Sequence, residues 1–157
     1  MKKLLIATSL LTLTTTSFAA TSGTLLLQGI VAKKVNIVVT PTAVASALVL
    51  ETSQTDLKVA TANEQSNTST GYKVTVSSAN LGKLKRTDGS EVFAYTLKYG
   101  GAAVGLSTAA GSVVTNSSSA SVVNANKDMS ISYTGVAAET MVEGTYADTL
   151  TVNIASN

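Results

Sequence analysis

The sequence contains nine carboxylate side chains, and a pair of them at a suitable distance would indicate acid–base chemistry. They are Asp56, Asp88, Asp128, Asp148 and five glutamates. General acid–base catalysis needs two such groups at a defined separation, and no spacing in the sequence singles out one pair. The sequence leaves a catalytic pair open, but we interpret these carboxylates as solvated groups in turns. Lys127-Asp128, beside Asn126, is interpreted as one such turn.

The sequence contains neither histidine nor cysteine. Serine–histidine and cysteine–histidine nucleophile pairs and the usual zinc sites therefore cannot be built. No glycine-rich phosphate loop follows a predicted strand and opens a helix. We expect that the protein is not an enzyme and that it uses no cofactor and no metal ion.

Residues 1–19 have the layout of a secretory signal peptide. Two lysines precede the apolar run Leu4–Leu13, and Ser17-Phe18-Ala19 places small residues where signal peptidase needs them, which predicts cleavage after Ala19. A membrane anchor is disfavoured, because a spanning helix needs ~18 apolar residues and threonines end this run earlier. We therefore predict export through the periplasm and no membrane insertion after cleavage.

Cleavage changes the charge balance of the chain. The sequence has 11 basic and 9 acidic residues, and two of the basic residues lie in the predicted signal peptide, which leaves 9 of each sign. A neutral mature chain offers no electrostatic attraction for nucleic acid or anionic lipid, so we expect neither as a partner. Its length fits a single domain.

Short runs that alternate between apolar and polar residues predict an all-β fold. The clearest predicted strands are Tyr72–Val76, Phe93–Tyr99, Met129–Tyr133 and Tyr146–Ile154. Weaker strands are predicted at Ala47–Leu50, Leu57–Ala62, Ala103–Leu106 and Ala120–Val123. Each strand should have one buried and one solvated face.

Turn residues separate these runs. The predicted turns are Asp88-Gly89 after the solvated Lys83–Arg86, Gly100-Gly101 in a tight hairpin, Asn116–Ser119 and Asn124–Asn126. Many short strands with turns at this spacing favour a sandwich or a barrel, and among these an immunoglobulin-like β-sandwich. Tyr146 then either forms a tyrosine corner or simply packs in the core.

Thr24–Val39 is the longest apolar stretch after the predicted signal peptide. Lys33-Lys34 divides it into Leu25–Val31, a detachable apolar strand, and Val35–Val39, the first strand of the domain. A free apolar strand is an aggregation hazard unless it fills a groove. Leu25–Val31 is therefore either the first strand of a complete sandwich or a strand donated to a neighbouring subunit.

Both ends of the chain resemble subunits of chaperone–usher pili, the fimbrial major subunits. Thr24-Leu-Leu-Leu-Gln-Gly-Ile-Val31 is similar to their N-terminal donor segment, in which apolar residues and a glycine alternate after a threonine. Gly144-Thr-Tyr-Ala-Asp148, continuing to Ile154, is similar to the Gly-x-Tyr-x-Asp strand that ends those subunits. The chain differs from many members in lacking cysteine and a C-terminal aromatic residue.

The resemblance implies an incomplete immunoglobulin-like sandwich whose apolar groove is filled first by a periplasmic chaperone. At an outer-membrane usher, the donor strand of the next subunit replaces the chaperone. The implied donor residues are Leu25, Leu27, Gly29 and Val31, and the implied acceptor residues are Tyr146, Leu150, Val152 and Ile154. The implied organisation is a signal peptide (1–19), a donor extension (20–34) and a pilin domain (35–157).

Two functions follow as hypotheses. The first is a structural subunit of a surface fimbria, polymerising with copies of itself and supporting adhesion or biofilm formation. A shaft position fits this length, because tip adhesins of the family usually carry a second, receptor-binding domain. The alternative is a secreted monomeric immunoglobulin-like module that binds a carbohydrate or a host protein.

Overall fold

The computed structural model describes residues 22–157. The predicted signal peptide and its cleavage position lie outside these residues. The chain divides into two units, Met1–Val31 and Ala32–Asn157. Of the first unit, residues 22–31 are described, and they form no regular secondary structure. The second unit contains all the described strands and the two short 3-10 helices, so the fold is all-β.

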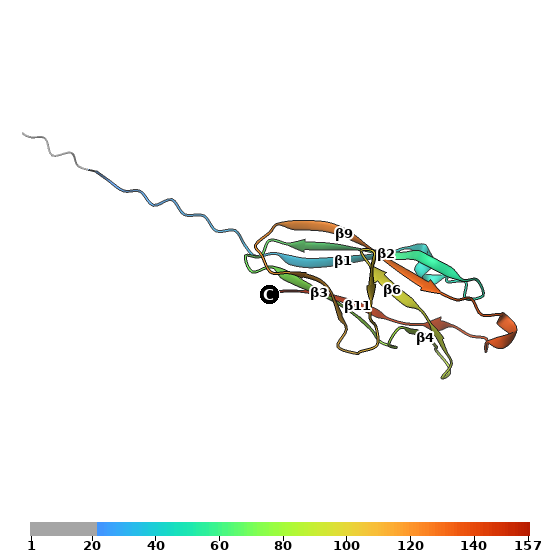
Figure 1. Cartoon of the computed structure of the whole chain (residues 1–157). Coiled ribbons are helices and arrows are strands. Elements are labelled where there is room, and N and C mark those ends of the chain that lie inside the picture. The colour runs from blue at the N-terminus through green and yellow to red at the C-terminus, as the bar shows by residue number, and fades with distance from the viewer. Residues whose placement is uncertain (1–21) are drawn as a thin grey trace, which may run out of the picture. The chain divides into compact units, whose positions relative to one another are not determined.

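The strands of the second unit form three antiparallel sheets (Figure 1). The largest has the order β1 (Val35–Pro41), β2 (Gln54–Ser66), β9 (Val123–Tyr133), β6 (Thr96–Tyr99), β7 (Ala102–Val104). The second has the order β11 (Leu150–Ser156), β3 (Tyr72–Ser78), β8 (Ser112–Ser117). The third has the order β10 (Tyr146–Ala147), β4 (Lys83–Arg86), β5 (Val92–Ala94). The 3-10 helices are η1 (Ala43–Ser46) and η2 (Ala138–Thr140).

Alternating side chains of facing sheets form the core. Val74 and Val76 of β3 have 0% of their surface exposed. Leu97 of β6 and Met129 of β9 are exposed by 1% and 2%. Burial of each such side chain contributes about 1.5–3 kcal/mol. This core between antiparallel sheets is consistent with a β-sandwich, and it confirms the all-β prediction.

The most deeply buried polar side chain is Glu64 of β2, with 0% of its surface exposed. Its Oε1 accepts hydrogen bonds from Tyr99 Oη at 2.8 Å and Thr115 Oγ1 at 2.7 Å, and its Oε2 accepts one from Tyr72 Oη at 2.8 Å. The interpretation of every carboxylate as a solvated turn residue is therefore wrong for Glu64. Three hydroxyl donors replace the water that this carboxylate loses on burial.

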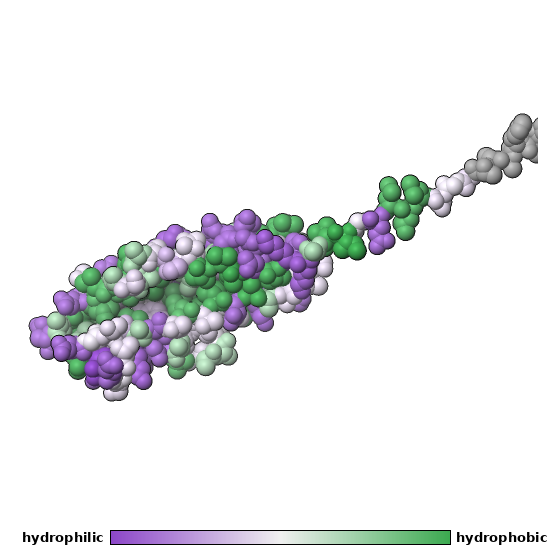
Figure 2. Space-filling model, turned by 180° about the vertical axis from the view of Figure 1, so that it is seen from behind, coloured by the Kyte–Doolittle hydropathy of each residue, from purple (hydrophilic) through white to green (hydrophobic). Residues whose placement is uncertain are grey.

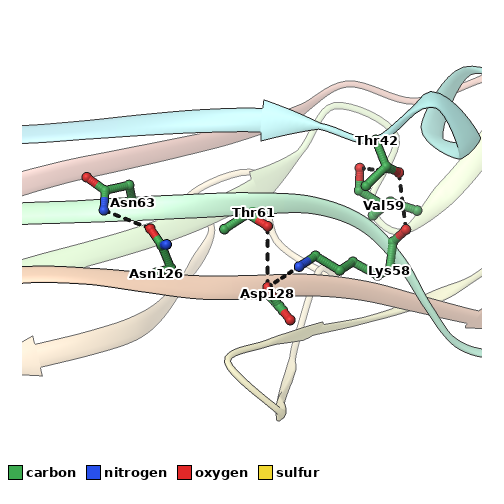
Figure 3. A network of polar contacts seen from close by, with 7 residues as sticks. All are labelled: Thr42, Lys58, Val59, Thr61, Asn63, Asn126 and Asp128. Carbon is green, nitrogen blue, oxygen red and sulfur yellow. Dashed lines mark hydrogen bonds and ion pairs between the residues drawn. The ribbon is translucent and has the colours of Figure 1, made fainter.

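Two predicted turns are also wrong, because Asn124–Asn126 and Lys127-Asp128 lie within the long strand β9. The side chains of Asn124, Asn126 and Asp128 lie on the solvated face of the strand, where they bond to β2, and Figure 3 shows Asn126 and Asp128. Lys127 lies on the opposite face. Asn63 Nδ2 donates to Asn126 Oδ1 at 2.8 Å, and Lys58 Nζ lies 2.6 Å from Asp128 Oδ1. Cross-strand amide and ion pairs of this kind stabilise a sheet modestly.

The remaining strand predictions divide into three groups. Tyr72–Val76, Leu57–Ala62 and Met129–Tyr133 are confirmed within longer strands, and Ala103–Leu106 overlaps β7. Ala47–Leu50 and Ala120–Val123 are not strands: the first follows η1 as a loop, and the second joins β9 only at Val123. Phe93–Tyr99 is divided at Tyr95, because β5 pairs with β4 whereas β6 pairs with β9. Tyr146–Ile154 is likewise divided at Asp148-Thr149, because β10 pairs with β4 whereas β11 pairs with β3.

Two predicted turns are confirmed, whereas the predicted turn Asn116–Ser119 is wrong for its first two residues, which belong to β8. Gly100 and Gly101 connect β6 to β7, with φ values of 56° and 86°. Positive φ at both central residues is the requirement of a tight hairpin turn, which glycine meets without strain. Asp88-Gly89 lies in the turn between β4 and β5. Across residues 22–157, no helix is both long and apolar enough to span a bilayer.

Candidate strand-acceptor groove

Two sheet edges face each other in the second unit without pairing. β1 is hydrogen-bonded on one side only, to β2, and β11 on one side only, to β3. The two strands nevertheless lie close together. Among the described strands, no backbone ladder joins them. Each therefore presents a free row of N–H and C=O groups toward the other.

An apolar groove of about 180 Å³ lies between these edges. β1 contributes Val39 and Pro41 to one wall, and β11 contributes Leu150 and Val152 to the other. The remaining lining residues are Ala45, Leu48, Val59, Ala60, Leu84, Tyr95, Met129, Ile131 and Asp148. Figure 2 shows hydrophobic side chains gathered around a hollow on one face of the domain, between polar borders.

The four predicted acceptor residues lie on one side of the C-terminal strands, with alternate positions more exposed. Leu150 and Val152 line the groove, and Ile154 packs half-buried against the core. Tyr146 lies further along, in the pocket described next. Its Oη donates to the Val142 backbone oxygen at 2.9 Å, which is the hydrogen bond that a tyrosine corner makes.

A larger end pocket of about 640 Å³ adjoins the groove. The groove and the end pocket share Ala45, Leu48, Leu84 and Asp148. The loops before β2 and around η2 form the rest of the pocket. Three carboxylates line it, from Glu51, Glu143 and Asp148, and no basic residue does. The lining of the end pocket is therefore acidic, whereas the lining of the groove is mainly apolar.

Asp148 lies where the groove and the end pocket meet. Its Oδ2 accepts hydrogen bonds from Ser78 Oγ and Tyr95 Oη, both at 2.6 Å, and its Oδ1 accepts from the backbone N–H of Asn80 at 3.0 Å. Burial, and then the bond to Asp148, raise the pKa of the Tyr95 phenol. Asp148 is half-buried and fixed by these neutral donors, so its interpretation as a solvated turn carboxylate is wrong.

The predicted donor residues lie in the first unit. Leu25, Leu27 and Val31 are 83%, 84% and 87% exposed, and a Cβ added at Gly29 would meet no atom within 4 Å. Leu26 and Ile30, on the alternate face, are equally exposed. The segment thus presents five large aliphatic side chains to solvent, and it forms no strand by itself.

The residues that follow this segment are held to the domain by Asn67, which the sequence patterns do not indicate. Asn67 Oδ1 accepts from the Lys34 backbone N–H at 2.5 Å, and Asn67 Nδ2 donates to the Ala32 backbone oxygen at 2.9 Å. Lys33 Nζ donates to Ser156 Oγ at 2.5 Å. Ala32–Lys34 therefore lie beside the end of β11, which we call the entry end of the groove.

Residues 22–157 contain no cluster of three or more metal-binding side chains. The groove combines apolar walls with free backbone edges, which are the features used when a strand is added to a sheet. In comparisons with known proteins, the chain matches no protein-family model and no curated protein.

Proposed function

We propose that this chain is a structural subunit of a bacterial surface fimbria that polymerises by donor-strand exchange. In this proposal the second unit is an incomplete immunoglobulin-like pilin domain, and residues 20–34 are its donor extension. The facing, unpaired edges of β1 and β11 carry the proposal. One chain then has both an open apolar groove and an exposed apolar segment.

The sizes of the two parts support this pairing. β11 has seven residues, and Leu25–Val31 also has seven. A strand inserted between two edges directs alternate N–H and C=O groups to each side, so it can hydrogen-bond both β1 and β11 once these edges stand about 10 Å apart, which is two strand spacings. The aliphatic side chains of the donor segment also match the apolar lining of the groove.

Approximate free energies show which interactions would hold the donor strand in the groove. Burial of Leu25, Leu27 and Val31 contributes on the order of 5–9 kcal/mol. Ordering seven backbone residues costs roughly 7–14 kcal/mol. Apolar contacts alone therefore do not hold the strand, and the backbone hydrogen bonds to both edges supply the remainder at about 0.5–1.5 kcal/mol each. A donor strand thus needs both the apolar walls and the two free edges.

The proposal includes partners and a location. A periplasmic chaperone would cover the groove of a new subunit, and an outer-membrane usher would exchange it for the next donor strand. The finished homopolymer would lie outside the cell and support adhesion or biofilm formation. Uncovered edges beside an apolar groove favour aggregation, which is the physical reason for a chaperone.

Gel mobility tests the proposal. The mature protein, produced with its chaperone and usher, should give a ladder of bands on a denaturing gel when unheated and one band after boiling. A matched variant lacking Thr21–Val31 should give no ladder and should regain bound strand when a Thr21–Lys33 peptide is added. A mature protein that stays monomeric under these conditions would favour the monomeric binding module instead.

A further inference from the structure

We infer that Lys33 of an incoming copy binds Asp148 of the receiving copy, so that the acidic end pocket is a docking surface for a second copy of this chain. The inference rests on the proposed function, since it requires Leu25–Val31 to occupy the groove. It adds a charged contact that locates the donor strand along the groove. Its basis is the direction of the strands, their register and the charges at the two ends of the domain.

The direction follows from the two ends of the groove. β1 begins, and β11 ends, at the entry end, where Lys33 contacts Ser156. Pro41 and Leu150 therefore lie toward the far end, beside the end pocket. A donor strand antiparallel to β11 would leave the groove at this far end. The reverse direction would bring the donor's lysines against the Lys33-Lys34 pair that the receiver already has at its entry end.

The register follows from the matching lengths. We align Leu25–Val31 antiparallel to the whole of β11. In this alignment, two residues that lie directly opposite each other have their side chains on the same face of the sheet. The opposed pairs are Leu25 with Ser156, Leu27 with Ile154, Gly29 with Val152 and Val31 with Leu150. The next pair on this face is Lys33 with Asp148. Lys34 points to the other face, because side chains alternate along a strand.

Asp148 is suited to receive a cation. It is half-buried, and its hydrogen-bond donors within the domain are all neutral. No ion pair among the described residues includes Asp148. Glu51 and Glu143 add negative charge around the end pocket, whereas Lys85 and Arg86 line a smaller pocket that Asp148 also lines. In the donor copy, Lys33 donates its one side-chain hydrogen bond to the neutral hydroxyl of half-buried Ser156, and a carboxylate is a stronger partner for an ammonium group.

The test uses the mature chain carrying Leu27→Asp, so that its own segment does not compete for grooves. The probe is a fluorescent synthetic peptide of Thr21–Lys34, whose Kd is measured by anisotropy at low and high salt. Lys33→Glu in the peptide should weaken binding about tenfold or more. Lys34→Glu is the matched control and should change the Kd by less than about threefold. High salt should weaken the wild-type peptide more than a Lys33→Gln peptide.

The receiving side gives a second, independent measurement. Glu51→Gln with Glu143→Gln should reduce the salt dependence, and Asp148→Asn should remove the preference for the wild-type peptide over the Lys33→Gln peptide. If Asp148→Asn fails to fold, the comparison of the Lys33→Glu peptide with the Lys34→Glu peptide still tests whether Lys33 makes the proposed contact. Equal binding by these two peptides would overturn the inference and leave donor-strand exchange intact. Binding by no peptide at all would overturn the proposed function itself.

Discussion

The carboxylate of Glu64 accepts a hydrogen bond from the phenol of Tyr72 at 2.8 Å, across the space between two sheets. Glu64 belongs to β2 of the five-stranded sheet, and Tyr72 belongs to β3 of the three-stranded sheet that ends in β11. Tyr99 and Thr115 complete the cluster from one sheet each. In a chain without cysteine, this polar cluster links sheets that no disulfide joins.

Glu64→Ala should lower the free energy of unfolding by about 3 kcal/mol or more, because three hydroxyl groups lose a charged acceptor. Urea-induced unfolding measures this effect. Gln65→Ala, at the adjacent position on the opposite face, is the control and should cost less than about 1 kcal/mol. Similar midpoints for the two variants would contradict the structural role of the cluster.

Burial, and then the bond to Glu64, raise the pKa of Tyr72 to about 12. The folded-state pKa lies above the ordinary value of 10.0, so this group's contribution to stability is complete below pH 10 and is lost as the pH rises toward 12. The free energy of unfolding should therefore fall across this pH interval. Urea titrations at successive pH values measure this fall. Tyr72→Phe should make the fall shallower, and an unchanged slope would contradict the assignment.

Leu150→Asp and Val152→Asp place a carboxylate against the apolar groove, and each should destabilise the domain by several kcal/mol. Thr151→Asp and Asn153→Asp, on the exposed face of the same strand, are the controls. The unfolding temperatures of the four variants show which face of β11 is turned inward. Equal stability across all four would show that the inward face has been assigned wrongly.

Assembly should depend on which face of the donor segment is changed. Leu27→Asp should abolish the unheated ladder, because a carboxylate would enter the groove, whereas Gln28→Asp should preserve it. Gly29→Leu should also block assembly, since the larger side chain would overpack the position opposite Val152. Loss of the ladder in Gln28→Asp alone would reverse the proposed orientation.

The mature protein should begin at Ala20, because Ser17 and Ala19 satisfy the small-residue rule for cleavage. Mass spectrometry of the intact secreted protein measures this directly. An Ala19→Arg variant should retain the signal peptide and accumulate in the cell. Secreted protein that still carries Met1 would contradict the predicted export route.

The sequence alone determined the faces of the clearest strands, since the two-residue period of a strand is a local property. Tyr72–Val76 and Leu150–Ile154 illustrate this, because the alternate residues that the pattern predicts to face inward do so. Gly100-Gly101 is predictable as a turn for an equally local reason, its tolerance of positive φ. Leu25–Val31 is also recognisable from its apolar residues, although its occupancy of a groove remains a prediction.

Only the tertiary structure decided which strand edges remain unpaired and which carboxylates are buried. The free edges of β1 and β11 depend on the neighbours of both strands, and no local pattern specifies these. The sequence around Glu64 does not indicate burial, because one of its hydrogen-bond donors, Thr115, lies 51 residues away along the chain. Asp148 likewise meets Ser78, 70 residues away. These contacts arise from long-range packing, in which a buried charge is tolerated only where distant donors converge on it.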